Sequence, residues 1–243
     1  GKGYAELTVR RRQIGQTRDD LLLAEWFSGR ELDPGADEIW EKIKEGQVSQ
    51  HLRFVQWEQP DELQTKLLEA LSSELSINDA KSFELSIGGS EYNGYVYFGS
   101  TKPDKPGACY KAEDWQILSP IRNNPFGVEA INRLVQTTYR SKTKEWSMKP
   151  YGRKTPKPMG AEEILYGDKV IQTRNERRFK VYPKEKAMQY VANGEIGIAV
   201  GQFKTKNMNF TPKELEVEFS SQPGYKYSYF RRKDFGEEAN PAL

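Results

Sequence analysis

The chain has 243 residues, of which 36% are hydrophobic and 30% are charged. No run approaches eighteen consecutive apolar residues, so the sequence gives no candidate for a membrane span. Cys109 is the single cysteine and His51 the single histidine, which excludes an internal disulfide and leaves little for zinc binding or Cys–His catalysis. The lone cysteine favours a reducing compartment, and we expect a cytoplasmic protein.

The formal net charge of +2 hides an uneven distribution. Residues 140–186 hold 14 Lys and Arg against 6 Asp and Glu, a net charge of +8, whereas the rest of the chain has a net charge of −6. A basic segment of this kind is typical of a surface that binds a polyanion such as nucleic acid. Charge runs are also common on solvated surfaces without a partner, so composition leaves both interpretations open.

The first 140 residues alternate strand and helix patterns. In chain order, the predictions are a strand at residues 5–11, a helix from 19 or 20 to 29, a helix at 36–45 and a strand at 52–57. Pro60 then begins the strongest predicted helix, in which Leu63, Leu67, Leu71 and Leu75 recur at every fourth residue.

The segment 77–111 is rich in Gly, Ser, Tyr and Pro, and it predicts an irregular excursion with a hairpin turn at Asn93-Gly94. A strand is expected at residues 114–119, followed by a helix whose apolar stripe includes Val128, Ile131 and Leu134. Alternating strands and helices predict an α/β lobe with a parallel, helix-covered sheet over residues 1–140.

The pattern changes after residue 140. Residues 141–164 predict a basic linker rich in Pro and Gly, and residues 165–231 predict a small all-β barrel of the SH3-like type. Its strands are expected within residues 167–173, 194–203, 214–219 and 225–230. Residues 232–243 are expected to return toward the first lobe.

The sequence contains no complete catalytic motif. The nearest match to a phosphate loop, residues 94–100, has no lysine after its second glycine. Acidic runs at residues 37–40 and 61–64 lie where helices are expected to begin, so they are most simply charges at helix starts. The chain is therefore not expected to be a complete enzyme.

Several runs resemble the RecD-like branch of superfamily 1 DNA helicases. In that family a strand ends in Ser-Pro, a basic turn follows, and a helix begins near Gly-Val-x-x-x-Asn-x-x-Leu-Gln. The matching residues are Ser119, Pro120, Arg122, Gly127, Val128, Asn132, Leu134 and Gln136, with Val135 between the last two. The family's inserted barrel begins with Gly-Asp-[Arg/Lys]-Val and Gln-Thr-Arg-Asn and continues with Asn-Gly-[Asp/Glu]-x-Gly, which residues 167–170, 172–175 and 193–197 match.

The resemblance implies a fragment of the second RecA-like motor lobe with its SH3-like barrel. A phosphate loop and an acidic box are expected before this segment, and a Thr-x-His-Lys-x-Gln-Gly motif after it. The intact helicase would use ATP and Mg²⁺ to move along single-stranded DNA. The fragment would need the rest of the helicase chain as its partner, would bind no cofactor by itself, and would be inactive alone.

The resemblance also implies site residues. Residues 7–13 match a strand that ends in Arg-Gln, so Arg12 and Gln13 are the expected nucleotide-binding residues, with Arg10 and Arg11 as alternative registers for the arginine. The expected nucleic-acid-binding residues are Ser119, Arg122, Asn132, Lys169, Arg174, Arg177 and Arg178. The N–H groups that begin the helix near residues 126–129 are expected to help hold a DNA phosphate.

Phe179 and Tyr182 are interleaved with the basic residues of the expected barrel, which suits base stacking beside backbone neutralisation. The same pattern fits a solvated hairpin whose aromatic rings pack on the barrel. The main alternative function is an adaptor module that binds nucleic acid or protein without motor activity.

Overall fold

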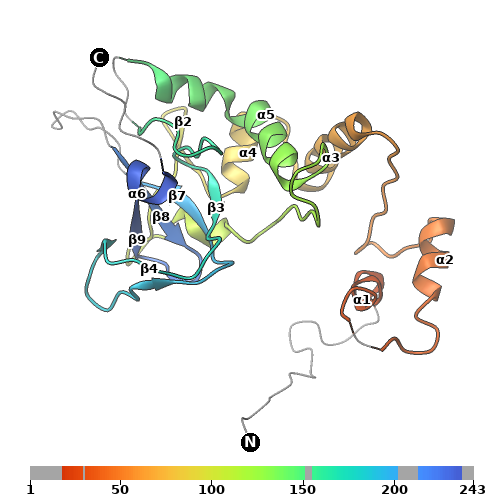
Figure 1. Cartoon of the computed structure of the whole chain (residues 1–243). Coiled ribbons are helices and arrows are strands. Elements are labelled where there is room, and N and C mark those ends of the chain that lie inside the picture. The colour runs from red at the N-terminus through yellow and green to blue at the C-terminus, as the bar shows by residue number, and fades with distance from the viewer. Residues whose placement is uncertain (1–17, 30, 151–154, 202–212, 237–243) are drawn as a thin grey trace, which may run out of the picture. The chain divides into compact units, whose positions relative to one another are not determined.

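The structure is a computed structural model that describes residues 18–29, 31–150, 155–201 and 213–236. It combines α-helices with antiparallel β-sheets, and it divides into two compact units between Glu58 and Gln59 (Figure 1). The predicted strand at residues 5–11, with Arg12 and Gln13, lies outside the described residues. No helix in the described ranges has both the length and the apolar character that a membrane span requires.

The first unit contains two short helices, α1 (Asp19–Glu25) and α2 (Glu38–Glu45). The Asp19 carboxylate joins them, because it accepts hydrogen bonds from the Ser49 N–H at 2.6 Å and the Lys42 ammonium at 3.1 Å. These bonds lower the pKa of Asp19, the Ser49 N–H contributing most. Gly46 ends α2 in a left-handed conformation with φ of 68°, which confirms the predicted stop.

The predicted strand at residues 52–57 is wrong, since this segment belongs to no sheet. Its apolar residues favour an extended backbone, but a strand also needs a neighbour that pairs with its N–H and C=O groups. No described segment provides that neighbour, and Phe54 and Trp57 are exposed.

The helices of the second unit are α3 (Pro60–Leu75), α4 (Ala80–Ser86), the 3₁₀ helix η1 (Ala108–Lys111) and α5 (Val128–Met148). Pro60 occupies the first turn of α3 as predicted. Asp79 and Ser82 form a reciprocal capping box at the start of α4. Between α4 and η1, strands β1 (Ser90–Tyr92) and β2 (Tyr95–Tyr97) form the predicted hairpin around Asn93 and Gly94.

The C-terminal part of the second unit is a five-stranded antiparallel sheet in the order β3-β7-β8-β9-β5. Its strands are β3 (Lys169–Ile171), β5 (Val181–Tyr182), β7 (Ile196–Val200), β8 (Glu214–Phe219) and β9 (Lys226–Phe230). Strands β4 (Glu176–Arg177) and β6 (Tyr190–Val191) form a separate pair, and α6 (Arg231–Phe235) follows β9. Both edge strands, β3 and β5, therefore come from the single run 169–182.

The predicted parallel sheet is not seen, because every strand pair among the described residues is antiparallel. The strand expected at residues 114–119 does not form either, although the helix after it does. Without a paired neighbour, this segment has no regular secondary structure, and the Leu118 side chain is 85% exposed. The coarser prediction of a mixed α/β chain is confirmed.

The predicted linker at 141–164 is also wrong in its described part. Residues 141–148 continue α5, because no Gly or Pro interrupts the sequence between Val128 and Lys149. Met159 is fully buried and pairs with Ile164 through a β-bridge. Residues 151–154 lie outside the described ranges, as do residues 237–243 of the expected return segment.

Two apolar cores meet at β7. Ile198 and Val200 join a core built from α3, α4, η1 and α5, whereas Ala199 points into the other core, formed mainly by β5, β8 and β9. Alternate side chains of a strand point to opposite faces, so β7 serves both cores. Figure 1 shows α4 and α5 side by side in this unit. The helices and the antiparallel sheet thus share one unit, and the expected domain boundary near residue 140 is not where the chain divides.

A buried arginine fixes this junction. The Arg140 side chain of α5 is 2% exposed and forms ion pairs with Glu84 of α4 and with Asp168, where Nε lies 3.0 Å from Oδ1. It also donates to the Tyr166 carbonyl. Burial raises the pKa values of Glu84 and Asp168, and the charge of Arg140 partly offsets this rise.

Gly167 allows the chain to pass this buried group. Its φ is +87°, and a Cβ atom there would lie 2.3 Å from the Phe98 ring and 3.0 Å from the Arg140 guanidinium. The Gly-Asp pair at the start of β3 is therefore explained by packing and by the buried ion pair.

We expect Gly167→Ala to destabilise the chain more than Gly194→Ala. Both glycines have positive φ, which costs another residue roughly 1–3 kcal/mol, but a Cβ at Gly194 would meet nothing within 4 Å. The clash with Phe98 should add about 1–3 kcal/mol for Gly167→Ala alone. Urea unfolding of the two variants measures the difference, and equal free energies of unfolding would contradict the packing argument.

Candidate nucleic-acid interface

The loop between Leu118 and α5 is held by its own hydrogen bonds. The Ser119 hydroxyl lies 3.1 Å from the Ile121 carbonyl oxygen and 3.3 Å from that of Phe126, and it accepts a hydrogen bond from the Ile121 N–H at 3.3 Å. Ser119 therefore shapes this turn. Its hydroxyl is engaged within the loop, whereas the sequence predicted that it would contact nucleic acid.

The N–H groups at the start of α5 also have partners within the loop. Val128 N–H donates to the Ile121 carbonyl at 2.9 Å, Glu129 N–H to Arg122 at 3.3 Å, and Gly127 N–H to Asn124 at 2.7 Å. Gly127 permits this close return, because a Cβ there would lie 2.6 Å from the Arg122 oxygen. The predicted use of these three N–H groups to hold a phosphate is wrong for this conformation.

Arg122 and Asn132 remain accessible. The Arg122 side chain is 79% exposed, and its ion-pair contact among the described residues is a long one with Glu129, at 3.5 Å between Nε and Oε1. An exposed pair of this kind contributes little, about 0–1 kcal/mol, so a phosphate could replace it. Asn132 is exposed in the second turn of α5, three residues after Glu129.

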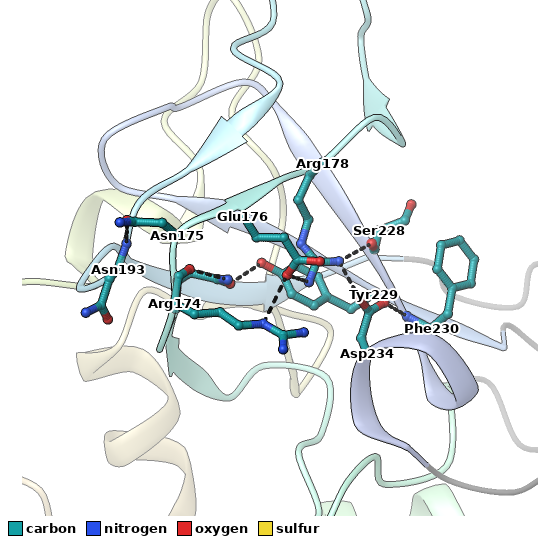
Figure 2. Close-up of polar contacts among 10 residues, drawn as sticks. Arg174, Asn175, Glu176, Arg178, Asn193, Ser228, Tyr229, Phe230 and Asp234 are labelled. Carbon is teal, nitrogen blue, oxygen red and sulfur yellow. Dashed lines mark hydrogen bonds and ion pairs between the residues drawn. The ribbon is translucent and has the colours of Figure 1, made fainter.

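The runs 172–175 and 193–197 form one hydrogen-bonded structure. The Asn175 side chain accepts from the Asn193 N–H at 2.8 Å, as Figure 2 shows, and Gly194 N–H donates to the Gln172 carbonyl at 2.8 Å. The Gln172 amide donates to the Arg174 carbonyl at 2.8 Å and accepts from the Tyr229 hydroxyl at 2.8 Å. These polar residues thus hold the turn between β3 and β4 against the end of β6.

Arg178 is buried, whereas a DNA-binding arginine must be accessible from solvent. Its side chain is 6% exposed and pairs with Glu176 and with Asp234 of α6, each at 2.8 Å (Figure 2). It also donates to the Ser228 carbonyl at 3.3 Å, and its guanidinium lies 3.7 Å from the Tyr229 ring centre. The prediction for Arg178 is wrong, because this arginine joins β4, β9 and α6 in the interior.

Lys169 is half-buried and has a similar structural role. Its ammonium donates to the Trp115 carbonyl and lies 5.1 Å from the centre of the Trp115 ring. Burial lowers the pKa of Lys169, an effect that the carboxylates of Glu113 and Asp114 partly oppose. The sequence predicted a DNA contact for Lys169. In the structure its ammonium instead attaches the segment before Ser119 to β3.

Arg174 and Arg177 remain exposed as expected. Arg174 approaches Glu176 only at 3.6 Å and is 66% exposed, and no ion pair involves Arg177 among the described residues. Arg177 lies directly opposite Tyr190 in the β4–β6 pair, which places a cation beside an exposed aromatic ring.

Two more exposed aromatic rings lie just before β5 and within it. Phe179 is 62% exposed and Tyr182 69% exposed, so both rings are accessible to a ligand. Tyr182 lies opposite Lys226 of β9, whose ammonium is 5.4 Å from the Tyr182 ring centre. Sequence reasoning missed Lys226, because only the strand register brings it beside Tyr182.

The described residues give no support for a reactive cysteine or for a metal site. Cys109 is fully buried, and burial raises the pKa of its thiol to about 12, so it is no nucleophile at neutral pH. No group of three or more potential metal ligands is found in the described ranges. The comparisons add no assignment, since no protein family, curated protein or solved structure matches this chain.

The neighbouring residues Arg177 and Arg178 allow a matched test of these placements. Arg178→Ala leaves the carboxylates of Glu176 and Asp234 without their buried partner and should cost about 3–5 kcal/mol of unfolding free energy. Arg177→Ala should change stability by no more than about 0.5 kcal/mol. Urea unfolding measures both, and a reversed order would contradict the assignment of Arg178 to the interior.

Proposed function

We propose that the chain is part of a RecD-like, ATP-dependent DNA helicase, and that it contributes contacts to single-stranded DNA. The observation that carries the proposal is the order and spacing of the runs at 119–136, 167–175 and 193–197. Three such runs in the same order are much more specific than any one of them. The proposed partners are single-stranded DNA and the rest of the helicase chain.

The DNA contacts are assigned to exposed residues of two regions. In the barrel region these are Arg174 and Arg177, with Phe179, Tyr182 and Tyr190 as exposed rings on which bases can stack. In the helix-start loop they are Arg122 and Asn132. Arg122 acts by its charge, since the neighbouring N–H groups are already bonded.

The finer fold assignment belongs to the same proposal. An isolated apolar segment at residues 114–119, with Leu118 almost fully exposed, is suited to pair with further strands of a RecA-like sheet. The antiparallel sheet, whose two edges come from the single run 169–182, is assigned as an SH3-like barrel. The single, buried Cys109 is compatible with a cytoplasmic location.

ATP and Mg²⁺ would act in the intact motor. Arg12, followed by Gln13, would reach the γ-phosphate of ATP held mainly by the other lobe, where a positive charge stabilises the charge that develops during phosphoryl transfer. The 243 residues contain no phosphate loop, so binding and hydrolysis of ATP need the remaining parts of the motor.

A protein-binding adaptor is the second candidate. It is favoured by the exposed aromatic residues at the β1–β2 hairpin, where Tyr95 stacks on Trp146 of α5 with ring centres 6.0 Å apart. Tyr92 of the same hairpin is also exposed. Exposed aromatic clusters are enriched at protein interfaces.

We expect the purified chain to bind a single-stranded oligonucleotide with an affinity that falls steeply as salt rises. Each lost phosphate contact should reduce the salt slope, the change of log K with log salt, by about 0.7. The double substitution Arg174→Ala/Arg177→Ala should therefore weaken binding and lower the slope by about 1.4, whereas Lys111→Ala/Lys142→Ala should leave both nearly unchanged. Fluorescence anisotropy over a salt series measures this. Absence of binding at low salt would contradict the DNA proposal and favour the adaptor.

We also expect no ATP hydrolysis by the chain alone, with or without single-stranded DNA. A coupled phosphate-release assay measures it, with the buffer as the baseline. Turnover of about 1 s⁻¹ or more, ordinary for enzymes, would show a complete catalytic site and contradict the assignment as a motor fragment.

A further inference from the structure

An open cavity of about 290 Å³ lies beside the β1–β2 hairpin, in the second unit. The lining residues with polar side chains are Ser90, Tyr97, Ser100, Lys102, Lys105 and Lys226. All of the charged residues in this lining are lysines, and no carboxylate is among the described lining residues. The volume is near the lower end for small-molecule sites and is enough for the phosphate and sugar of one nucleotide.

A tight turn places two of these lysines on one side. Lys102 and Lys105 exchange two backbone hydrogen bonds, at 2.9 and 3.2 Å, across the turn at Pro103 and Asp104. Residues that exchange both bonds lie directly opposite each other, with side chains on the same face. Like charges in such a pair repel, although exposure to water weakens the effect, and an anion bound between them would relieve this repulsion.

Among the described residues, the side chains of Lys102, Lys105 and Ser100 have no partner, whereas Lys226 is paired with Glu216. Neither the Lys102 nor the Lys105 ammonium forms an ion pair among the described residues, and no hydrogen bond from the Ser100 hydroxyl is found there. An ammonium group can only donate hydrogen bonds, whereas a hydroxyl can donate and accept. A cavity with this set of groups is suited to a ligand that is rich in acceptor oxygens and negatively charged.

Lys226 adds an ordered ammonium group to the cavity lining, held by an ion pair. Its ammonium lies 2.7 Å from the Glu216 carboxylate of β8 and 5.4 Å from the Tyr182 ring centre. Lys226 therefore lines the cavity and also touches an exposed ring of the proposed DNA-binding region.

We propose that this cavity is a phosphate-binding site formed by Lys102, Lys105, Lys226 and Ser100. The phosphate is carried either by a nucleic-acid strand or by a free nucleotide, and the chemistry of recognition is the same for both. This site lies apart from the loop at Arg122 and from the pair Arg174 and Arg177. It does not depend on the helicase assignment.

The test uses the full chain labelled with ¹⁵N, titrated separately with oligo-dT and with sodium pyrophosphate. We expect the amide signals of Ser100, Lys102 and Lys105 to shift with at least one of them. A shift with oligo-dT identifies the strand as a source, and a shift with pyrophosphate alone identifies a free phosphate. If neither ligand shifts these signals, the proposal is overturned, even where oligo-dT binds through Arg174 and Arg177.

The variant Lys102→Gln/Lys105→Gln checks the role of the two charges. It should weaken binding of the ligand that shifts the signals by about tenfold or more, which corresponds to roughly 1.4 kcal/mol. Its thermal stability should equal or exceed that of the unaltered chain, because a repulsive pair is removed. The control Lys111→Gln/Lys142→Gln changes the charge equally outside the cavity and should bind normally. Unchanged binding by the first variant, or equal loss in both, would overturn the proposal.

If the unaltered chain binds pyrophosphate at the cavity but no oligonucleotide at low salt, the DNA-binding function fails and the phosphate site stands. If oligonucleotide binding depends on Arg174 and Arg177 but not on Lys102 and Lys105, the function stands and the cavity proposal fails. The two proposals are therefore tested separately by one set of variants.

Discussion

The burial of the Arg140 guanidinium constrains the whole second unit. A buried cation is costly unless its donors are satisfied, and here Glu84 of α4 satisfies them together with Asp168 and the Tyr166 carbonyl, both in the segment before β3. Helix α4, helix α5 and the entry to β3 must therefore be in place together. This requirement explains why the helices and the antiparallel sheet share one unit, although the sequence composition changes sharply between them.

Arg178 shows that the net charge of a sequence segment overestimates the positive charge that is accessible on its surface. It belongs to the basic segment 140–186, yet it lies in the interior with Glu176 and Asp234 as partners, and Lys169 of the same segment is held at Trp115. The positive charge that remains accessible is smaller than the net charge of the segment suggests. Within it, the exposed Arg177 lies opposite the exposed ring of Tyr190.

Sequence reasoning identified features that depend on local chemistry. The leucine repeat of α3, the turn at Asn93-Gly94 and the helix after Gly127 all formed as predicted. The strands at 52–57 and 114–119 did not, since a strand depends on a partner that local pattern cannot supply. For the same reason the sequence could not separate buried Arg178 from exposed Arg177: their difference depends on strand register and on Asp234, which lies 56 residues further along the chain.

The run 169–182 supplies both edges of the five-stranded sheet, and those edges, β3 and β5, are only three and two residues long. Long unpaired edges are the usual template on which a second chain adds a strand. This sheet offers very little of that template. Edge-to-edge aggregation through it is therefore disfavoured, even at a high local concentration of the chain.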